Sequence, residues 1–275
     1  MRVKSLIITG YGVNCEKEMA LGYQLAGATA TFAHINAVLQ SKVNIFEYNI
    51  INFPGGFSFG DELGAAKALA NKITFSKLKN GKTLREELVG FVHRNGYILG
   101  VCNGFQLLVR LGLLPNFSAE QEVSLAFNSS GKFEDRWVLH KINPLSPCVF
   151  TNGIDTIYLP VRHGEGKFCV KDSNILRQIQ SENLDVLQYC DKEGKPTMDY
   201  PQNPNGSLES IGGICDRTGR IFGMMAHPEA FLLFYNHPKW TSIIKSGKPS
   251  VKGLSQEGSG LAIFKNVINC AIGGG

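Results

Sequence analysis

The sequence predicts an α/β protein in which a mostly parallel central sheet is flanked by helices. Short apolar runs alternate with helix-like segments across roughly the first hundred residues, as expected for parallel strands joined by crossover helices. The second half is less regular and shows strand-like alternation, so we expect antiparallel additions to the sheet there. The chain has 275 residues, of which 43% are hydrophobic, and this is enough to bury one large core.

The first half of the chain predicts its elements one after another. Residues 3–9 are apolar and β-branched and stop at a glycine turn, which predicts a first strand. Residues 16–26 carry apolar side chains at helical spacing and are followed by a glycine, which predicts a helix. Residues 29–35 predict a second strand, and residues 48–53 predict a third that ends in the sharp turn Pro54-Gly55-Gly56.

The remaining elements follow with less regularity. Residues 63–72 and 82–94 are expected to be helices, residues 97–101 a short buried strand and residues 104–113 a helix. Beyond these we expect strands within 124–170 (as at 136–140 and 156–160), a loop at 199–207, a strand at 221–226, an irregular surface segment at 235–258 and a helix at 260–271. Because no repeat and no long linker divides the chain, we expect one domain over residues 1–275, with 231–275 as a C-terminal extension.

Composition excludes several classes of protein. The 28 Lys+Arg and 23 Asp+Glu residues leave a net charge of only +5, without the concentrated basic patch of a nucleic-acid binder. No apolar run reaches the roughly 18–20 residues that cross a bilayer. The seven cysteines are odd in number and form no CxxC pair, which argues against a disulfide framework or a structural zinc site. We therefore expect a cytoplasmic protein that binds neither nucleic acid nor membrane.

The strongest chemical signal is the segment GVCNGFQ at residues 100–106, which follows an apolar strand and opens a helix. A nucleophile on such a tight strand-to-helix turn needs small residues two positions before and after it, and Gly100 and Gly104 flank Cys102 in this way. The positive end of the helix dipole also favours a thiolate there. Cys102 is therefore the candidate nucleophile.

A cysteine nucleophile needs a base, and the base needs a group that orients it. His227-Pro228-Glu229 follows the strand expected at 221–226. Pro228 disfavours helix for His227, so we expect the segment to stay extended, with His227 and Glu229 on one side. Glu229 can then hold one ring nitrogen while the other faces Cys102.

Acyl transfer also needs an oxyanion hole. The backbone N–H of Asn103 lies directly after the nucleophile, and the turn containing Gly55 and Gly56 ends a separate strand. We expect these three residues to supply the donors. The site would then be assembled from the ends of three strands.

GVCNGFQ, a preceding PGG and a late HPE resemble the class I (triad-type) glutamine amidotransferases. Five further stretches resemble the glutamine amidotransferase subunits of phosphoribosylformylglycinamidine synthase, and they run in order along the chain: FPGGFSFGD (53–61), NSSGKFEDRWV (128–138), PVRHGEGKF (160–168), NPNGS (203–207) and GMMAHPE (223–229). The resemblance implies a flavodoxin-like α/β core. It also implies a triad of Cys102, His227 and Glu229, with Gln106, Phe57 and His163 binding the substrate.

The resemblance further implies a glutaminase that releases ammonia from glutamine and delivers it to a synthase subunit, with a small bridging subunit as a further partner. The synthase would convert formylglycinamide ribonucleotide to formylglycinamidine ribonucleotide in purine biosynthesis. No GxxxxGK[ST] phosphate-binding loop occurs in the chain, so we expect ATP and Mg²⁺ on the partner and no metal or cofactor here. Two alternatives remain: another cysteine hydrolase of similar fold, or a non-catalytic regulatory subunit.

Overall fold

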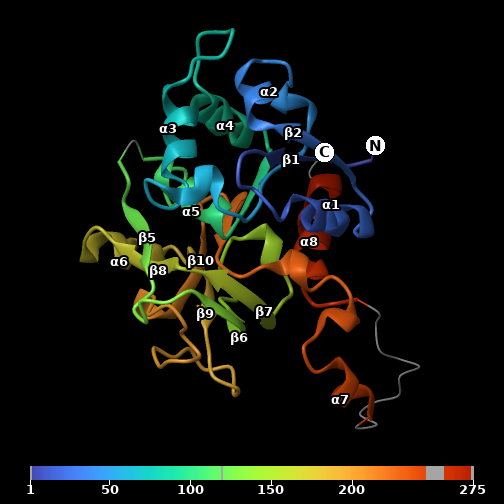
Figure 1. Cartoon of the computed structure of the whole chain (residues 1–275), viewed down its shortest axis with the longest axis vertical. Coiled ribbons are helices and arrows are strands. Elements are labelled where there is room, and N and C mark those ends of the chain that lie inside the picture. The colour runs from blue at the N-terminus through green and yellow to red at the C-terminus, as the bar shows by residue number, and fades with distance from the viewer. Residues whose placement is uncertain (1, 119, 246–256, 274–275) are drawn as a thin grey trace.

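The computed structural model describes residues 2–118, 120–245 and 257–273. In this part of the chain a nine-stranded sheet has the order β2-β1-β3-β4-β11-β10-β9-β6-β7 (Figure 1). Its strands are β1 (Lys4–Thr9), β2 (Thr29–His34), β3 (Ile50–Phe53), β4 (Tyr97–Val101), β6 (Glu134–Ile142), β7 (Thr156–His163), β9 (Asp185–Tyr189), β10 (Ile211–Cys215) and β11 (Ile221–Met224). The prediction of an α/β fold is confirmed.

One half of the sheet is parallel throughout. The strands β2, β1, β3, β4 and β11 pair in parallel, and their order matches the 2-1-3-4-5 order of flavodoxin-like folds. Every residue of β3, β4 and β11 is buried, which explains why these strands are continuous apolar runs in the sequence. In such a sheet the carboxyl ends of the strands lie at one edge, where ligands bind.

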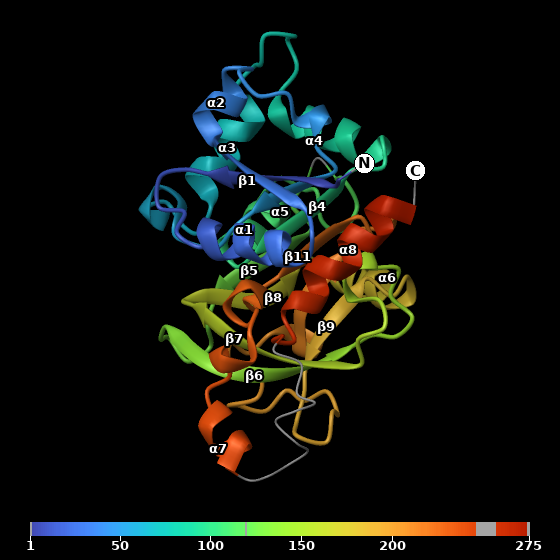
Figure 2. The ribbon, with the colours of Figure 1, turned by 90° about the vertical axis from the view of Figure 1, so that its right-hand side faces the viewer.

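Helices cover both faces of this parallel half. Figures 1 and 2 show α1 and α8 on one face and α3 and α4 on the other. The helices are α1 (Glu16–Leu25), α2 (Ile35–Leu39), α3 (Lys67–Phe75), α4 (Leu84–His93), α5 (Asn103–Arg110), α6 (Ser173–Ser181), α7 (Trp240–Lys245) and α8 (Leu261–Gly273). The sequence specifies the start of α4, because Thr83 and Glu86 form a reciprocal capping box.

The helix expected at residues 63–72 begins later than predicted. Gly64 and Ala66 both have positive φ, and α3 starts only at Lys67. The preceding 3-10 segment Ser58–Asp61 also contains left-handed residues. Apolar spacing alone could not show these backbone reversals, because the contacts made there lie outside a helical pattern: the Ala65 N–H donates to Glu165 Oε2 at 3.4 Å and the Ala66 N–H to Asp61 Oδ1 at 3.0 Å.

The antiparallel half departs from the prediction in one respect. Strands β10, β9, β6 and β7 continue the main sheet as antiparallel additions, as expected. However, β5 (Val123–Phe127) and β8 (Glu165–Val170) form a separate two-stranded sheet. The chain leaves the main sheet at Gly164, the one residue between β7 and β8.

The antiparallel half curls back onto the end of β11. Val161 in β7 forms an isolated bridge with Ala226, and the His227 N–H donates to the Pro160 carbonyl at 2.9 Å. Although β7 is the last strand in the sheet order, it therefore lies against the segment that follows β11. This closure places residues from β7 and β8 beside the carboxyl ends of the parallel strands.

The C-terminal helix α8 packs against the body of the protein. Its five buried side chains lie on one helical face, as the sequence spacing suggested: Leu261, Ile263, Phe264, Val267 and Ile268. The ring of Phe264 meets Tyr23 of α1 edge-on, with ring centroids 4.9 Å apart. The irregular segment predicted at 235–258 is wrong in part, because residues 240–245 form α7, and residues 246–256 lie outside the described residues. Among the helices described, none is long and apolar enough to span a membrane.

The contact between α8 and α1 predicts a stability difference within one helix. Phe264→Ala should lower the free energy of unfolding by about 3–5 kcal/mol, because it opens a cavity in a fully buried contact. Ile272→Ala on the same helix should change it by less than about 0.5 kcal/mol, since Ile272 is 64% exposed. Denaturant unfolding of both variants measures this, and equal effects would contradict the packing described.

Candidate active site

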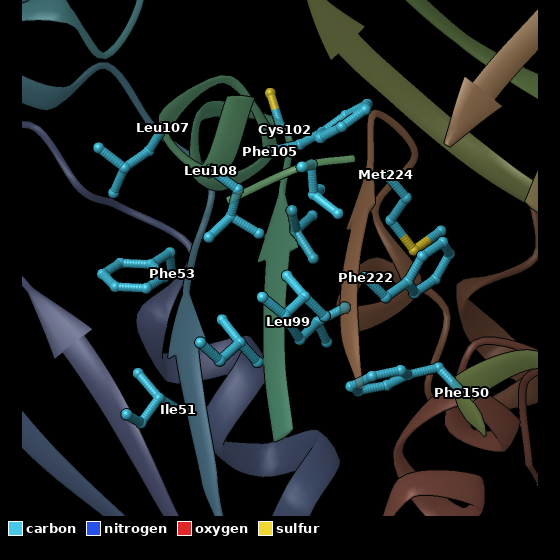
Figure 3. Close-up of a cluster of buried hydrophobic side chains, with 14 of the residues drawn as sticks. Ile51, Phe53, Leu99, Cys102, Phe105, Leu107, Leu108, Phe150, Phe222 and Met224 are labelled. Atoms are coloured by element: carbon cyan, nitrogen blue, oxygen red, sulfur yellow. The ribbon is translucent and has the colours of Figure 1, made fainter. Parts of the chain in front are cut away.

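Cys102 occupies a strained turn between β4 and α5. Its φ of 52° and ψ of −108° are unusual for a residue with a side chain. Its N–H donates to the Met224 carbonyl of β11 at 2.8 Å, and its carbonyl accepts from the Gln106 N–H at 3.0 Å. Figure 3 shows Cys102 at the end of β4, with its sulfur directed away from the buried apolar cluster. The thiol is thereby held at the edge of the core.

The two flanking glycines are sterically required, as the sequence pattern suggested. A Cβ on Gly100 would lie 2.7 Å from the Gly104 carbonyl oxygen, and a Cβ on Gly104 would lie 1.8 Å from the Phe53 carbonyl oxygen. Both contacts are far inside normal van der Waals distance. The tight approach of α5 to β3 and β4 that positions Cys102 therefore depends on glycine at both places.

His227 and Glu229 form a close buried pair after β11. The His227 Nδ1–H donates to Glu229 Oε1 at 2.6 Å, and the side chains are only 3% and 2% exposed. The expected contact is present, but the expected extended backbone is not. His227 itself is extended, whereas Pro228–Ala230 forms a 3-10 turn. Pro228 at the first position of that turn suits it, because the fixed φ of proline favours helical geometry there.

The electrostatics of His227 follow from its neighbours. Burial by itself lowers the pKa of His227, but the charge of Glu229 and the nearby Cys102 and Cys15 sulfurs outweigh it and hold the pKa well above its usual value. Nε2 of the ring is buried and has no hydrogen-bond partner among the described residues. The ring can therefore hold a proton on the nitrogen that Glu229 does not occupy.

Gly55 lies between the candidate nucleophile and base. A Cβ on Gly55 would be 2.8 Å from His227 Cε1 and 3.4 Å from Cys102 Cβ. The following residue, Gly56, forms a bridge with Val13. The bonds of that bridge run from the amides of residues 14 and 57 to the carbonyls of residues 55 and 12. They do not occupy the N–H groups of Gly55 and Gly56.

Asn103 is the first residue of α5, so its N–H is one of the helix donors without an intrahelical acceptor. Its side chain is fully engaged elsewhere. Oδ1 accepts from the Ser58 N–H at 3.1 Å, and Nδ2 donates to Asp61 and to Gln106 Oε1. These contacts tie the turn after Cys102 to the loop after Gly56, the two segments expected to supply the oxyanion donors.

Two cavities meet at Cys102. One, of about 150 Å³, is lined by Gln106 and His163, and the other, of about 300 Å³, by His227 and Glu229. Residues that line both are Gly56, Phe57, Cys102, Phe133 and Arg162. The Cys102 side chain can therefore face a ligand in the smaller cavity while His227 lies beside the larger one.

The three predicted substrate-binding residues all line the smaller cavity, but they differ in what they contact. Gln106 is bonded inside the protein at both ends of its amide, to Asn103 and to the Glu165 carbonyl at 2.5 Å. Phe57 is 46% exposed at the rim. Gln106 therefore shapes the cavity wall, whereas Phe57 is open to a ligand.

His163 is buried and held by Asn128, with 3.1 Å between His163 Nδ1 and Asn128 Oδ1. The Asn128 amide group donates to two backbone carbonyls, so its Oδ1 is the acceptor and Nδ1 of His163 carries the proton. Burial, and then repulsion from His227, lowers the pKa of His163 to about 3. His163 is therefore a neutral ring whose Nε2 can accept a hydrogen bond.

Sequence reasoning missed several residues of the site. Asp61 and Glu165 fall inside the quoted family stretches, and Arg162 lies beside His163. The family resemblance could therefore have identified them as site residues. Cys15 had no comparable signal. Its sulfur lies 4.0 Å from His227 Nδ1, although 212 residues separate the two in sequence.

Comparisons with known proteins decide the family. The model of the CobB/CobQ-like glutamine amidotransferase domain matches residues 2–270. The phosphoribosylformylglycinamidine synthase subunit PurQ of Dehalococcoides mccartyi is 42% identical over 271 residues, covering 98% of both chains. The chain belongs to this glutamine amidotransferase family.

Further relatives agree with this assignment. The PurQ subunit of Methanococcus maripaludis is 42% identical to this amidotransferase and covers 96% of both chains. A solved structure described as PurLQS from Thermotoga maritima shares its fold, with a TM-score of 0.69, 24% identity, and 98% and 99% coverage of the two chains. The flavodoxin-like core implied by the sequence is confirmed. The alternative of a different cysteine hydrolase is not supported.

The position of Gly55 predicts a selective loss of activity. Gly55→Ala should reduce the kcat for glutamine hydrolysis by about tenfold or more, because the new methyl group displaces the His227 ring from Cys102. Gly90→Ala in α4 is a matched control, since its Cβ would meet nothing closer than 3.9 Å. Steady-state kinetics and thermal unfolding of both variants measure the effect. An unchanged kcat in Gly55→Ala would show that the ring tolerates displacement.

Proposed function

We propose that this amidotransferase is the glutaminase subunit of a phosphoribosylformylglycinamidine synthase. The main structural support for this proposal is the 2.6 Å contact between the buried side chains of His227 and Glu229 after β11. This pair lies beside a cysteine on the strained turn at the end of β4. The family is one of glutamine amidotransferases, and the relatives are subunits of phosphoribosylformylglycinamidine synthase. We infer from them that glutamine is the substrate and that the ammonia serves purine biosynthesis.

In the first half of the proposed reaction, glutamine enters the cavity lined by Gln106, Phe57 and His163. The Cys102 thiolate attacks the side-chain amide carbon and forms a tetrahedral adduct. Its oxyanion accepts hydrogen bonds from the backbone N–H of Asn103 and from the turn at Gly55 and Gly56. The imidazolium of His227, supported by Glu229, donates its Nε2 proton to the departing ammonia.

In the second half, a water molecule attacks the thioester carbonyl while neutral His227 accepts the water proton. The same donors hold the second oxyanion. Its collapse breaks the carbon–sulfur bond, glutamate leaves and the Cys102 thiolate reforms beside the His227 imidazolium. The high pKa of His227 suits both halves, because the ring must be protonated whenever the thiolate is free.

The proposed partner is a synthase subunit that receives the ammonia and converts formylglycinamide ribonucleotide to formylglycinamidine ribonucleotide, with a small bridging subunit as a further partner. ATP and Mg²⁺ would bind to the synthase, and the reaction described above needs no metal or cofactor in this chain. We also propose that the complex is cytoplasmic.

Loss of the nucleophile should abolish synthesis from glutamine but not synthesis from free ammonia. In the complex with its synthase, Cys102→Ala should lower glutamine-dependent synthesis by about 10³-fold or more and leave ammonia-dependent synthesis near normal. Cys270→Ala, a matched cysteine on α8, should affect neither. Rates with each nitrogen source measure the difference. Near-normal glutamine-dependent activity in Cys102→Ala would favour the regulatory-subunit alternative.

The two remaining triad members should differ in severity. His227→Asn should be nearly as damaging as Cys102→Ala, because it removes proton transfer. Glu229→Gln should be milder, since it removes only orientation and charge support, and it should lower the pKa of His227. Kinetics and an NMR titration of the His227 ring test both statements. An unchanged His227 pKa in Glu229→Gln would contradict the electrostatic role of the pair.

A further inference from the structure

Cys15 approaches the base from the side opposite its free nitrogen. Its sulfur lies 4.0 Å from His227 Nδ1, the same nitrogen that bonds to Glu229. The thiol sulfur, the ring nitrogen and a Glu229 oxygen lie within 4.8 Å of one another, and no other such group of three potential ligands occurs in the described residues. Cys15 has no role in the proposed reaction.

The backbone holds Cys15 firmly in this position. Its N–H donates to the Gly55 carbonyl at 3.4 Å, and its own carbonyl accepts the Met19 N–H of α1. The neighbouring bridge between Val13 and Gly56 fixes the same segment to the end of β3. The thiol therefore approaches His227 because the main chain places it there, and α1 anchors it from behind.

The donor set fits a zinc ion. Thiolate sulfur, imidazole nitrogen and carboxylate oxygen are the ligands that zinc takes, at about 2.3, 2.0 and 2.0–2.2 Å. Tetrahedral geometry at those lengths needs about 3.5 Å between sulfur and nitrogen, against the 4.0 Å present. It also needs the His227–Glu229 contact of 2.6 Å to open by somewhat over half an ångström. Small side-chain rotations suffice for both changes.

A second, independent observation points to a ligand at this place. Oε2 of Glu229 is buried and without a hydrogen-bond partner in the described part of the chain, and the whole residue is only 4% exposed. Buried carboxylate oxygens are normally satisfied. The cavity of about 300 Å³ that Cys15, His227 and Glu229 line gives an ion a path to these atoms.

We propose that Cys15, His227 and Glu229 form an inhibitory zinc site behind the catalytic base. Zinc binding would release the proton of the Cys15 thiol and the Nδ1 proton of His227 to solvent, with water from the cavity as a fourth ligand. Its affinity should therefore weaken as the pH falls. With zinc on Nδ1 the ring would be a neutral imidazole that keeps its Nε2 proton, and giving that proton to the departing ammonia would leave an unfavourable imidazolate, so the ring could no longer act as the acid of the proposed reaction. The inhibitory effect rests on the proposed function, whereas the binding site does not.

Direct binding tests the site without any assay of activity. We would titrate the isolated full chain with Zn²⁺ against a chromophoric chelator, and with Co²⁺ to follow the thiolate-to-cobalt charge-transfer band. Cys102→Ser should keep one tight site and its band. Cys15→Ser and Cys15→Ala should each weaken zinc binding by at least about tenfold and lose the band. Cys270→Ser is the matched control and should behave as wild type.

The outcomes separate this site from metal capture by the nucleophile itself. Loss of binding in Cys102→Ser, with retention in both Cys15 variants, would overturn the proposal, because the ion would then lie between Cys102 and His227. Unchanged affinity in either Cys15 variant that remains folded by circular dichroism would overturn it as well. The two replacements differ in size and polarity, so the test does not depend on one of them.

A second readout connects the site to function. In the synthase complex, zinc should inhibit glutamine-dependent synthesis at concentrations that leave ammonia-dependent synthesis unaffected. Cys15→Ser should shift the half-inhibiting concentration upward by at least about tenfold, relative to its own metal-free rate. Equal sensitivity of Cys15→Ser and wild type would refute inhibition through this site. If no glutaminase activity exists in any form, the proposed function fails and the binding result still stands.

Discussion

The backbone turn at Cys102 is the constraint on which the rest of the site depends. A residue with a side chain adopts a φ of 52° and a ψ of −108° only when its surroundings enforce it. Here the Met224 carbonyl of β11 holds the N–H from one side, and the close approach of Gly104 to the Phe53 carbonyl fixes the helix from the other. The strands on either side of β4, β3 and β11, thus hold the turn in place, and the segments that follow them carry the proposed oxyanion donors and the proposed base.

Local features of this site were predictable from the sequence because they depend on residues that are close to one another in the chain. Glycine two positions before and after Cys102 reports a steric need that the structure shows directly. The spacing of His227 and Glu229 correctly suggested their contact, although the 3-10 turn that makes it was not foreseen. The parallel half of the sheet followed from the alternation of strands with helices, whereas its flavodoxin-like core was implied only by the family resemblance.

Features that depend on distant pairing were not predictable. The separate sheet of β5 and β8 arises because the chain turns away at Gly164, and apolar alternation cannot say which sheet a strand joins. The return of β7 to the end of β11 joins Val161 to Ala226 and brings the walls of both cavities together. Cys15 reaches His227 only because the strand ends of β1, β3 and β11 lie at one edge of the sheet.

The buried pair of His227 and Glu229 is better explained by chemistry than by stability. Removing two charged groups from water costs several kcal/mol for each ion, and their attraction offsets this only when the other polar atoms are also satisfied. Here Nε2 of His227 and Oε2 of Glu229 have no partner among the described residues. In proteins generally, replacing a buried ion pair by an apolar pair of similar volume is often neutral or stabilising. The arrangement is therefore one that folding alone would not favour, and its unsatisfied atoms are those left for reacting groups or for an ion.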